Sequence, residues 1–183
     1  VVGNYLYAID RGKSSDRHNG EVRTFDVSNP DKPLEIMHER FGSDASYMDI
    51  RGHYAYLVSQ QGLDVYDVSD PTLPQYLSRN SDHYYLYLDG RVKVSGKHLV
   101  ATDRTHMLIY DISDPARPVL RNKLAISVQQ NGSQNFDIQG DILYSADGNR
   151  WDGVALVITD ISDPENPTIL SQMTGLSQNA YSG

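Results

Sequence analysis

Acidic and amide side chains gather in two stretches where they would suit cation binding or acid–base chemistry. The spacing Asp147-x-Asn149-x-x-Asp152 offers three oxygen ligands of the kind that Ca²⁺ prefers. It lacks the bidentate Glu and the spacing of an EF-hand loop. Asp10 and Asp16 form a sparser pair of the same type. Because Asp and Asn in loops also cap turns through backbone amides, calcium at Asp147, Asn149 and Asp152 stays open beside a purely structural interpretation. No other cofactor is predicted.

Aromatic and polar side chains in the same parts of the chain are candidates for ligand binding. Trp151 is the single tryptophan; it suits a stacking platform or interface anchor, or it packs over a neighbouring sheet. His83-Tyr84 reads as a recognition patch, or as the lead-in to a strand that the alternation in Tyr85-Leu86-Tyr87-Leu88 favours. The candidate binding residues are Asp16, His18, His83, Tyr84, Asn149 and Trp151.

Four further aspartates resemble catalytic acids but recur too regularly for that role. Each opens an octapeptide Asp-x-Ser-Asp-Pro-x-x-Pro, with Asn for the second Asp in the first copy. Asp and Ser side chains bond backbone amides one or two residues on, and Pro fixes φ, so the octapeptide predicts a turn. A carboxylate repeated in every copy serves that turn, and no catalytic residue is predicted. The leading residues are Asp26, Asp67, Asp111 and Asp160, at intervals of 41, 44 and 49 residues.

Composition excludes several classes of partner and chemistry. The 183 residues carry a net charge of −8, and Lys and Arg are scattered singly among the acids. Nucleic acids and anionic membranes need clustered basic residues, so neither is a predicted partner. No stretch is apolar enough for a membrane span. Without cysteine there is no thiolate nucleophile or disulfide. The six histidines show no zinc-binding spacing, and no phosphate-binding loop or nucleophile elbow is present.

A repeat in the forties predicts one supersecondary unit copied along the chain. Short apolar runs before and after the octapeptide predict two strands, here named C and D. A glycine between two alternating runs predicts a tight hairpin that joins strands A and B. These glycines are Gly3, Gly52, Gly96 and Gly140. Four short strands per copy and no helical periodicity indicate an all-β blade.

The pentads that end in the leading aspartates resemble the LVIVD repeat. They read Leu63-Asp64-Val65-Tyr66-Asp67, Met107-Leu108-Ile109-Tyr110-Asp111 and Leu156-Val157-Ile158-Thr159-Asp160. The first copy departs from the pattern with Val22-Arg23-Thr24-Phe25-Asp26, and the third has Val100 where the others have Tyr. The resemblance implies a β-propeller, often in secreted or cell-surface proteins of bacteria and archaea, and it names no catalytic residue.

The expected fold class is all-β, with propeller blades of four antiparallel strands in four repeats. Residues 1–183 form a single partial propeller domain, with repeats near 1–40, 41–84, 85–128 and 129–183. One arrangement is a ring of four blades, in which the last strand pairs with the first blade. The favoured one is part of a larger propeller, because both ends of the chain stop at the same strand–glycine point and the family suggests larger rings.

The loops predict where function lies. In a propeller, the A–B and C–D turns share one face, and the B–C and D–A loops share the other. From the end of strand B to the leading Asp there are 11 residues in the middle copies, 19 in the first and 16 in the last. Variation on one face is typical of a binding face.

We therefore expect a non-enzymatic extracellular or cell-surface scaffold that binds a protein or glycan through the B–C and D–A loops. One alternative is a hydrolase or lyase that uses Asp16, Asp147 or Asp152. The other is a structural subunit of an extracellular assembly, an oligomer joined through blade edges.

Overall fold

The computed structural model describes residues 2–10, 21–40, 47–59, 61–82, 90–103, 105–125, 135–149 and 153–176, and every regular element in them is a strand. The strands are β1 (Tyr5–Asp10), β2 (Glu21–Asp26), β3 (Leu34–Arg40), β4 (Tyr47–Arg51), β5 (Tyr54–Ser59), β6 (Gly62–Asp67), β7 (Gln75–Asn80), β8 (Val92–Ser95), β9 (His98–Thr102), β10 (His106–Asp111), β11 (Val119–Ala125), β12 (Asn135–Gln139), β13 (Ile142–Asn149), β14 (Gly153–Asp160) and β15 (Thr168–Leu176).

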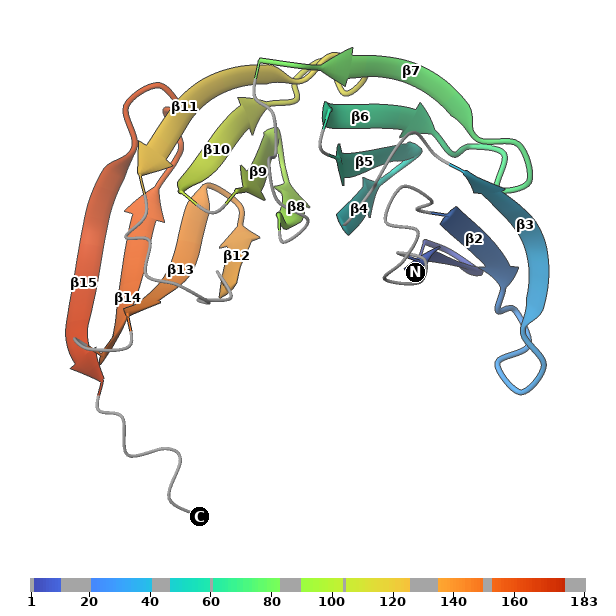
Figure 1. Cartoon of the computed structure of the whole chain (residues 1–183), viewed down its shortest axis with the longest axis horizontal. Helices are drawn as coiled ribbons and strands as arrows, with labels where there is room; N and C mark the ends of the chain where they lie inside the picture. Colours follow the sequence, from blue (N-terminus) through green and yellow to red (C-terminus); the bar gives the residue numbers. More distant parts are fainter. Residues whose placement is uncertain are drawn as a thin grey trace.

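These strands form four separate antiparallel sheets, which we call blades 1 to 4: β1–β3, β4–β7, β8–β11 and β12–β15. Figure 1 shows the blades side by side along an open arc, with strand D of each blade (β3, β7, β11 and β15) on the outer rim. The all-β propeller fold is confirmed. Blade 1 has three strands among the described residues, and blades 1 and 4 lie at opposite ends of the arc rather than closing a ring of four.

The A–B hairpins form where the glycines predict them. Gly52 has φ +57°, and Arg51 pairs with Tyr54 across a two-residue turn. A β-carbon at Gly52 would meet no atom within 4 Å, so backbone conformation alone favours glycine there. The same left-handed φ occurs at Gly3, Gly96 and Gly140.

The octapeptides form one hydrogen-bonded turn that is repeated in each blade. In blade 2, Asp67 accepts the backbone N–H of Ser69 at 2.8 Å, and Asp70 accepts that of Thr72 at 2.9 Å. The equivalent bond from Ser to the leading Asp is also 2.8 Å in the other copies, at Asp26, Asp111 and Asp160. These carboxylates are therefore occupied by their own turns.

A β-bulge lies at the same point of strand D in all four blades. In blade 2 the register shifts between Val65 and Tyr66, which leaves Leu77 of β7 without an opposite residue. The same shift occurs between Thr24 and Phe25, Ile109 and Tyr110, and Ile158 and Thr159. A bulge bends its strand and increases the local twist, so strand D is bent at the same point in every blade.

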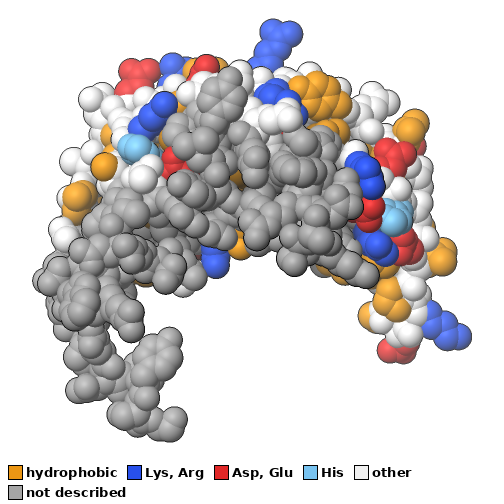
Figure 2. Space-filling model, in the orientation of Figure 1, with side chains coloured by type: hydrophobic (Ala, Val, Ile, Leu, Met, Phe, Trp, Pro, Cys, Tyr) orange, Lys and Arg blue, Asp and Glu red, His pale blue; other side chains and the backbone are white. Residues whose placement is uncertain are grey.

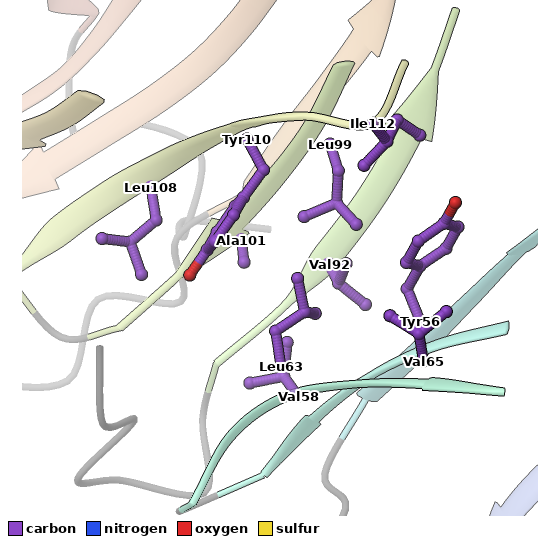
Figure 3. Packing of buried hydrophobic residues seen from close by; sticks show 10 residues of the cluster. All are labelled: Tyr56, Val58, Leu63, Val65, Val92, Leu99, Ala101, Leu108, Tyr110 and Ile112. Carbon is purple, nitrogen blue, oxygen red and sulfur yellow. The ribbon is translucent and has the colours of Figure 1, made fainter. Parts of the chain in front are cut away.

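The core lies between the blades rather than inside any one of them. Figure 3 shows side chains of blades 2 and 3 pointing toward one another, including Tyr56 and Val65 from one blade and Leu99 and Tyr110 from the other. Similar clusters join blade 1 to blade 2 and blade 3 to blade 4. Each middle blade is thus apolar on both faces, which explains why its strands read as nearly continuous apolar runs.

Candidate interaction face

The strand ends that precede and follow the B–C and D–A connections lie at the same edge of each antiparallel sheet, and we call this side of the arc the loop face. The B–C connection is short in blade 2, where Ser59 pairs with Gly62. It is long in blade 1, where residues 11–20 separate β1 from β2. In blade 4 the 16-residue spacing predicts a long loop as well, but the strands on either side of it take up part of that length. The backbone of Asp147 pairs with Ala155 and that of Asn149 with Gly153, so both strands extend further.

Most of the predicted site residues lie outside the described residues. These are Asp16, His18, His83, Tyr84, Trp151 and Asp152. The backbones of Asp147 and Asn149 lie near and at the end of β13. The candidate calcium ligands and the candidate binding set therefore stay predictions. The structure describes the strand ends on either side of these residues.

Blade 1 contributes a charged cluster at the loop face. The ring Nε2 of His38 lies 2.6 Å from a carboxylate oxygen of Glu21, and Arg23 and Arg40 approach the same carboxylate at 3.7 and 3.8 Å. The hydrogen bond from His38 is the main reason why the pKa of Glu21 lies below its usual range, and the two arginines add to this. Figure 2 shows acidic, basic and histidine side chains gathered over this end of the arc.

Blade 2 holds an ion pair between a buried carboxylate and a partly exposed guanidinium near the loop face. Asp64, which is 2% exposed, accepts hydrogen bonds from Arg79 Nε at 2.6 Å and Nη2 at 2.9 Å. Arg79 also donates to Gln61 in the B–C connection. The bond to Asp64 raises the pKa of the Arg79 guanidinium. A bidentate pair of this kind satisfies a carboxylate that would be costly to bury alone, so Asp64 anchors strand D and is not free for catalysis.

Polar contacts also cross the seam between blades 2 and 3. Asn80 of β7 donates its amide to the Pro118 carbonyl at 3.0 Å, and the Lys123 ammonium of β11 reaches the Asp82 carbonyl at 3.5 Å. The Arg91 guanidinium lies 5.7 Å from the centre of the Tyr47 ring, a cation–π distance. These contacts fix both ends of the D–A connection of residues 83–89.

The short B–C connection of blade 3 is held by its own carboxylate. Asp103 accepts the backbone N–H groups of Thr105 and His106 at 2.5 and 2.6 Å. Across the part of the chain that the structure describes, no three His, Asp or Glu side chains converge on a metal-sized site. The described residues of the loop face therefore form hydrogen-bonded turns and ion pairs, with exposed polar groups beside them.

Sequence reasoning missed the pairs Asp64–Arg79 and Glu21–His38. A usable signal was present for the first of them. An Asp inside an apolar pentad that packs against another blade needs a cationic partner, and strand D of the same blade carries Arg79. No local signal points to the second pair, because Glu21 and His38 are 17 positions apart and meet only through the β2–β3 register.

Comparison with known families gives a direct result. The LVIVD repeat model matches residues 42–80, 90–125 and 132–174, which together are more than half of the chain. This chain belongs to the LVIVD repeat family. The unmatched first copy is the one whose pentad departs from the pattern.

A solved structure shares the fold. The chain is similar to a functionally unknown protein from Desulfotomaculum acetoxidans, with a TM-score of 0.64 and 14% sequence identity. The match covers 94% of this chain and 57% of that protein. No curated protein matches this sequence. The described residues include no helix that is long and apolar enough to cross a membrane.

Proposed function

We propose that this chain is an interaction module that binds a protein or a glycan through its loop face, outside the cell or at its surface. One observation carries the proposal: the two faces of the arc are built differently. The A–B and C–D face repeats the same glycine hairpin and the same 2.8 Å octapeptide bond in every blade. The loop face is not repeated in this way: residues 11–20 separate β1 from β2, whereas Ser59 pairs directly across to Gly62 in blade 2, and the polar groups at the strand ends differ between blades 1, 2 and 3.

The chemistry of the loop face supports a polar partner. Ion pairs, amides and hydroxyl groups lie at the strand ends of blades 1 to 3, and the residues that the sequence predicts for binding follow strand ends of blades 1, 2 and 4 in the sequence. Polar and aromatic side chains on a rigid β frame are common in protein interfaces and polar ligand sites. The extracellular placement comes from the LVIVD resemblance, and detecting the protein in the outer fractions of its source cells would test it.

The test compares binding by matched variants on the two faces. The purified chain is applied to a glycan array and to immobilised cell-surface proteins, and each hit is titrated. The loop-face variants are Trp151→Ala and Tyr84→Ala. The control is Arg117→Ala, which removes an exposed side chain from the octapeptide of blade 3. We expect at least one loop-face variant to lose about tenfold or more in affinity, as truncated interface anchors do.

Two results would contradict the proposal. The first is that Arg117→Ala weakens binding while both loop-face variants bind like the wild type. The second is that the chain binds nothing on either panel at concentrations up to the solubility limit.

A further inference from the structure

The exposed apolar side chains of the described residues gather at the outer strands. Apart from Leu6 and Tyr144, each large hydrophobic side chain that is exposed lies on strand D of its blade or in the octapeptide before it. Figure 2 shows hydrophobic side chains along the outer rim of the arc. Blade 2 has a blade on each side, and yet its Leu73, Tyr76 and Leu77 are 60%, 53% and 39% exposed. We call these three side chains the rim patch.

The repeat does not require apolar residues at the positions of the rim patch. At the position of Leu73, the other octapeptides carry exposed polar residues: Lys32, Arg117 and Asn166. Tyr76 corresponds to Glu35 in blade 1, and Leu77 corresponds to Arg121 in blade 3. Because the same blade forms with charged side chains at these positions, the fold does not explain why blade 2 exposes Leu, Tyr and Leu to water. Grouped apolar side chains that a fold leaves exposed indicate contact with another molecule.

Hydrogen bonds and packing fix the rim patch in place. The backbone N–H of Leu73 donates to the carbonyl of Asp70 at 3.2 Å within the octapeptide turn. The Tyr76 ring packs edge-on against the Tyr66 ring, with the two ring centres 5.4 Å apart. Directly after the patch, Ser78 donates its hydroxyl to a backbone carbonyl of blade 3. A surface that is already ordered loses little conformational entropy when a partner binds it.

Two carboxylates beside the rim patch form no ion pair with a described residue. Asp67 and Asp70 each use only Oδ1 for their printed turn hydrogen bonds, so Oδ2 of both remains open to a partner. Hydrogen bonds from the Ser69 backbone and the Thr72 side chain are the main reasons why the pKa of Asp67 and that of Asp70 lie below the usual range. Both groups are therefore ionised at neutral pH. Residues 67–78 contain no Lys or Arg.

We propose that the rim patch is a docking site for a protein segment that places an apolar side chain next to Lys or Arg. The rim patch would bury the apolar side chain, and the open oxygens of Asp67 and Asp70 would pair with the basic groups. Tyrosine is a frequent anchor of protein interfaces. The same carboxylates would repel an anionic membrane. The patch lies at the beginning of β7 and the loop face at its end, so the two surfaces are distinct.

Binding to sets of short synthetic peptides tests the proposal. The first set carries a central Leu or Phe flanked by Lys and Arg. The second set has Glu in place of the basic residues, and the third has Ser in place of the central residue. We expect the wild type to bind the first set only, with an affinity that falls as the salt concentration rises, because exposed charges are screened by salt.

Neutral substitutions identify the residues that bind. Leu73→Asn, which copies blade 4, and Tyr76→Ala should each lose about tenfold or more in affinity, as truncated interface anchors do. Asp70→Asn, which copies the first octapeptide, should lose about threefold and depend less on salt, as expected for an exposed ion pair. Ile169→Ala, at the 63% exposed position of blade 4 that corresponds to Tyr76, is the matched control and should bind like the wild type. Circular dichroism verifies that each variant is folded.

Several results would overturn the proposal. They are no binding to any peptide set, equal binding to the basic and acidic sets, wild-type affinity in both Leu73→Asn and Tyr76→Ala, or an equal loss in Ile169→Ala. Vesicles of anionic lipid and sedimentation of the chain alone are measured in parallel. Vesicle binding or self-association that Leu73→Asn abolishes, without peptide binding, would assign the rim patch to a membrane or to a second copy instead.

Discussion

Replacing Thr24 by Val should stabilise the protein, because the structure leaves the Thr24 hydroxyl buried without a partner. Thr24 is 0% exposed, and its Oγ1 is one of two buried side-chain polar atoms in the described residues that have no hydrogen-bond partner. The equivalent residues of the other blades are Val65, Ile109 and Ile158, all apolar. Blade 1 therefore places a hydroxyl where the repeat places hydrocarbon.

The size of the effect follows from two contributions. An unsatisfied buried hydroxyl costs about 1–3 kcal/mol, and Val keeps the shape of Thr while replacing that hydroxyl with a methyl group. We expect the free energy of unfolding to rise by about 1–2 kcal/mol. For a chain of this size, 1 kcal/mol corresponds to about 2–4 °C in Tm, so Tm should rise by roughly 2–8 °C.

Urea unfolding followed by circular dichroism measures the change, and Thr102→Val is the matched control. Thr102 is equally buried, but its hydroxyl accepts the Arg91 N–H at 3.0 Å, so the same substitution there should destabilise. If Thr24→Val lowers the urea midpoint as Thr102→Val does, the Thr24 hydroxyl has a partner and the reasoning is refuted.

Three further predictions concern the turns and the tyrosines. Gly52→Ala should lower the free energy of unfolding, measured in urea, by about 1–2 kcal/mol, because Gly52 has a positive φ. Gly52→Asn should lower it less. Equal stability of Gly52→Ala and the wild type would argue against the hairpin. Tyr56→Phe should lower the free energy of unfolding by about 0.5–1.5 kcal/mol, because the hydrogen bond to the Pro115 carbonyl is lost. Tyr76→Phe, at an exposed position, should change it little. A larger loss for Tyr76→Phe than for Tyr56→Phe would contradict the contact between the blades. Burial raises the pKa of Tyr56 and Tyr66 to about 12. The two tyrosines should therefore contribute fully to the free energy of unfolding below about pH 10, the usual tyrosine pKa. That contribution should be lost as pH rises from about 10 through about 12. Urea midpoints measured against pH would show this loss, and a midpoint that stays constant up to pH 12 would contradict it.

The carboxylates of the octapeptides give the opposite dependence on pH within that same series. Hydrogen bonds from the Ser69 backbone and side chain hold the pKa of Asp67 below its usual range, and the Ser113 side chain and backbone do the same for Asp111. These carboxylates stabilise the folded protein fully above their unfolded pKa, about 3.9. This stabilisation is lost as pH falls through their lower pKa in the folded protein. The urea midpoint should therefore also fall in acid below about pH 4.

Local features were predictable from sequence, and features set by packing between blades were not. The hairpin at Gly52 follows from a single residue type with a single conformational need, so its position is clear in the sequence. The bulge at Leu77, opposite Val65 and Tyr66, is not, since it is a matter of strand register and Leu77 looks like any other strand residue. The extent of the outer strands is not visible in the sequence either, because only their first residues are apolar, whereas β11 continues through Arg121, Asn122 and Lys123 to Ala125.

The candidate site was only partly predictable for a similar reason. Loop lengths identify the loop face, because variation between copies is visible in the sequence. The polar pairs behind it depend on register. Asp64 and Arg79 become partners only because β6 and β7 pair in the alignment that the bulge permits.

The central claim is that the apolar core lies between the blades, with one face of each sheet packed against the facing side of the next sheet. Nuclear Overhauser contacts between the Tyr56 ring and the methyl groups of Ile112 test it most directly, since the two residues lie in different blades of one buried cluster. The account predicts strong cross-peaks that disappear in Tyr56→Ala. Absence of these cross-peaks in the folded wild type, with Tyr56 contacting only its own sheet, would contradict it.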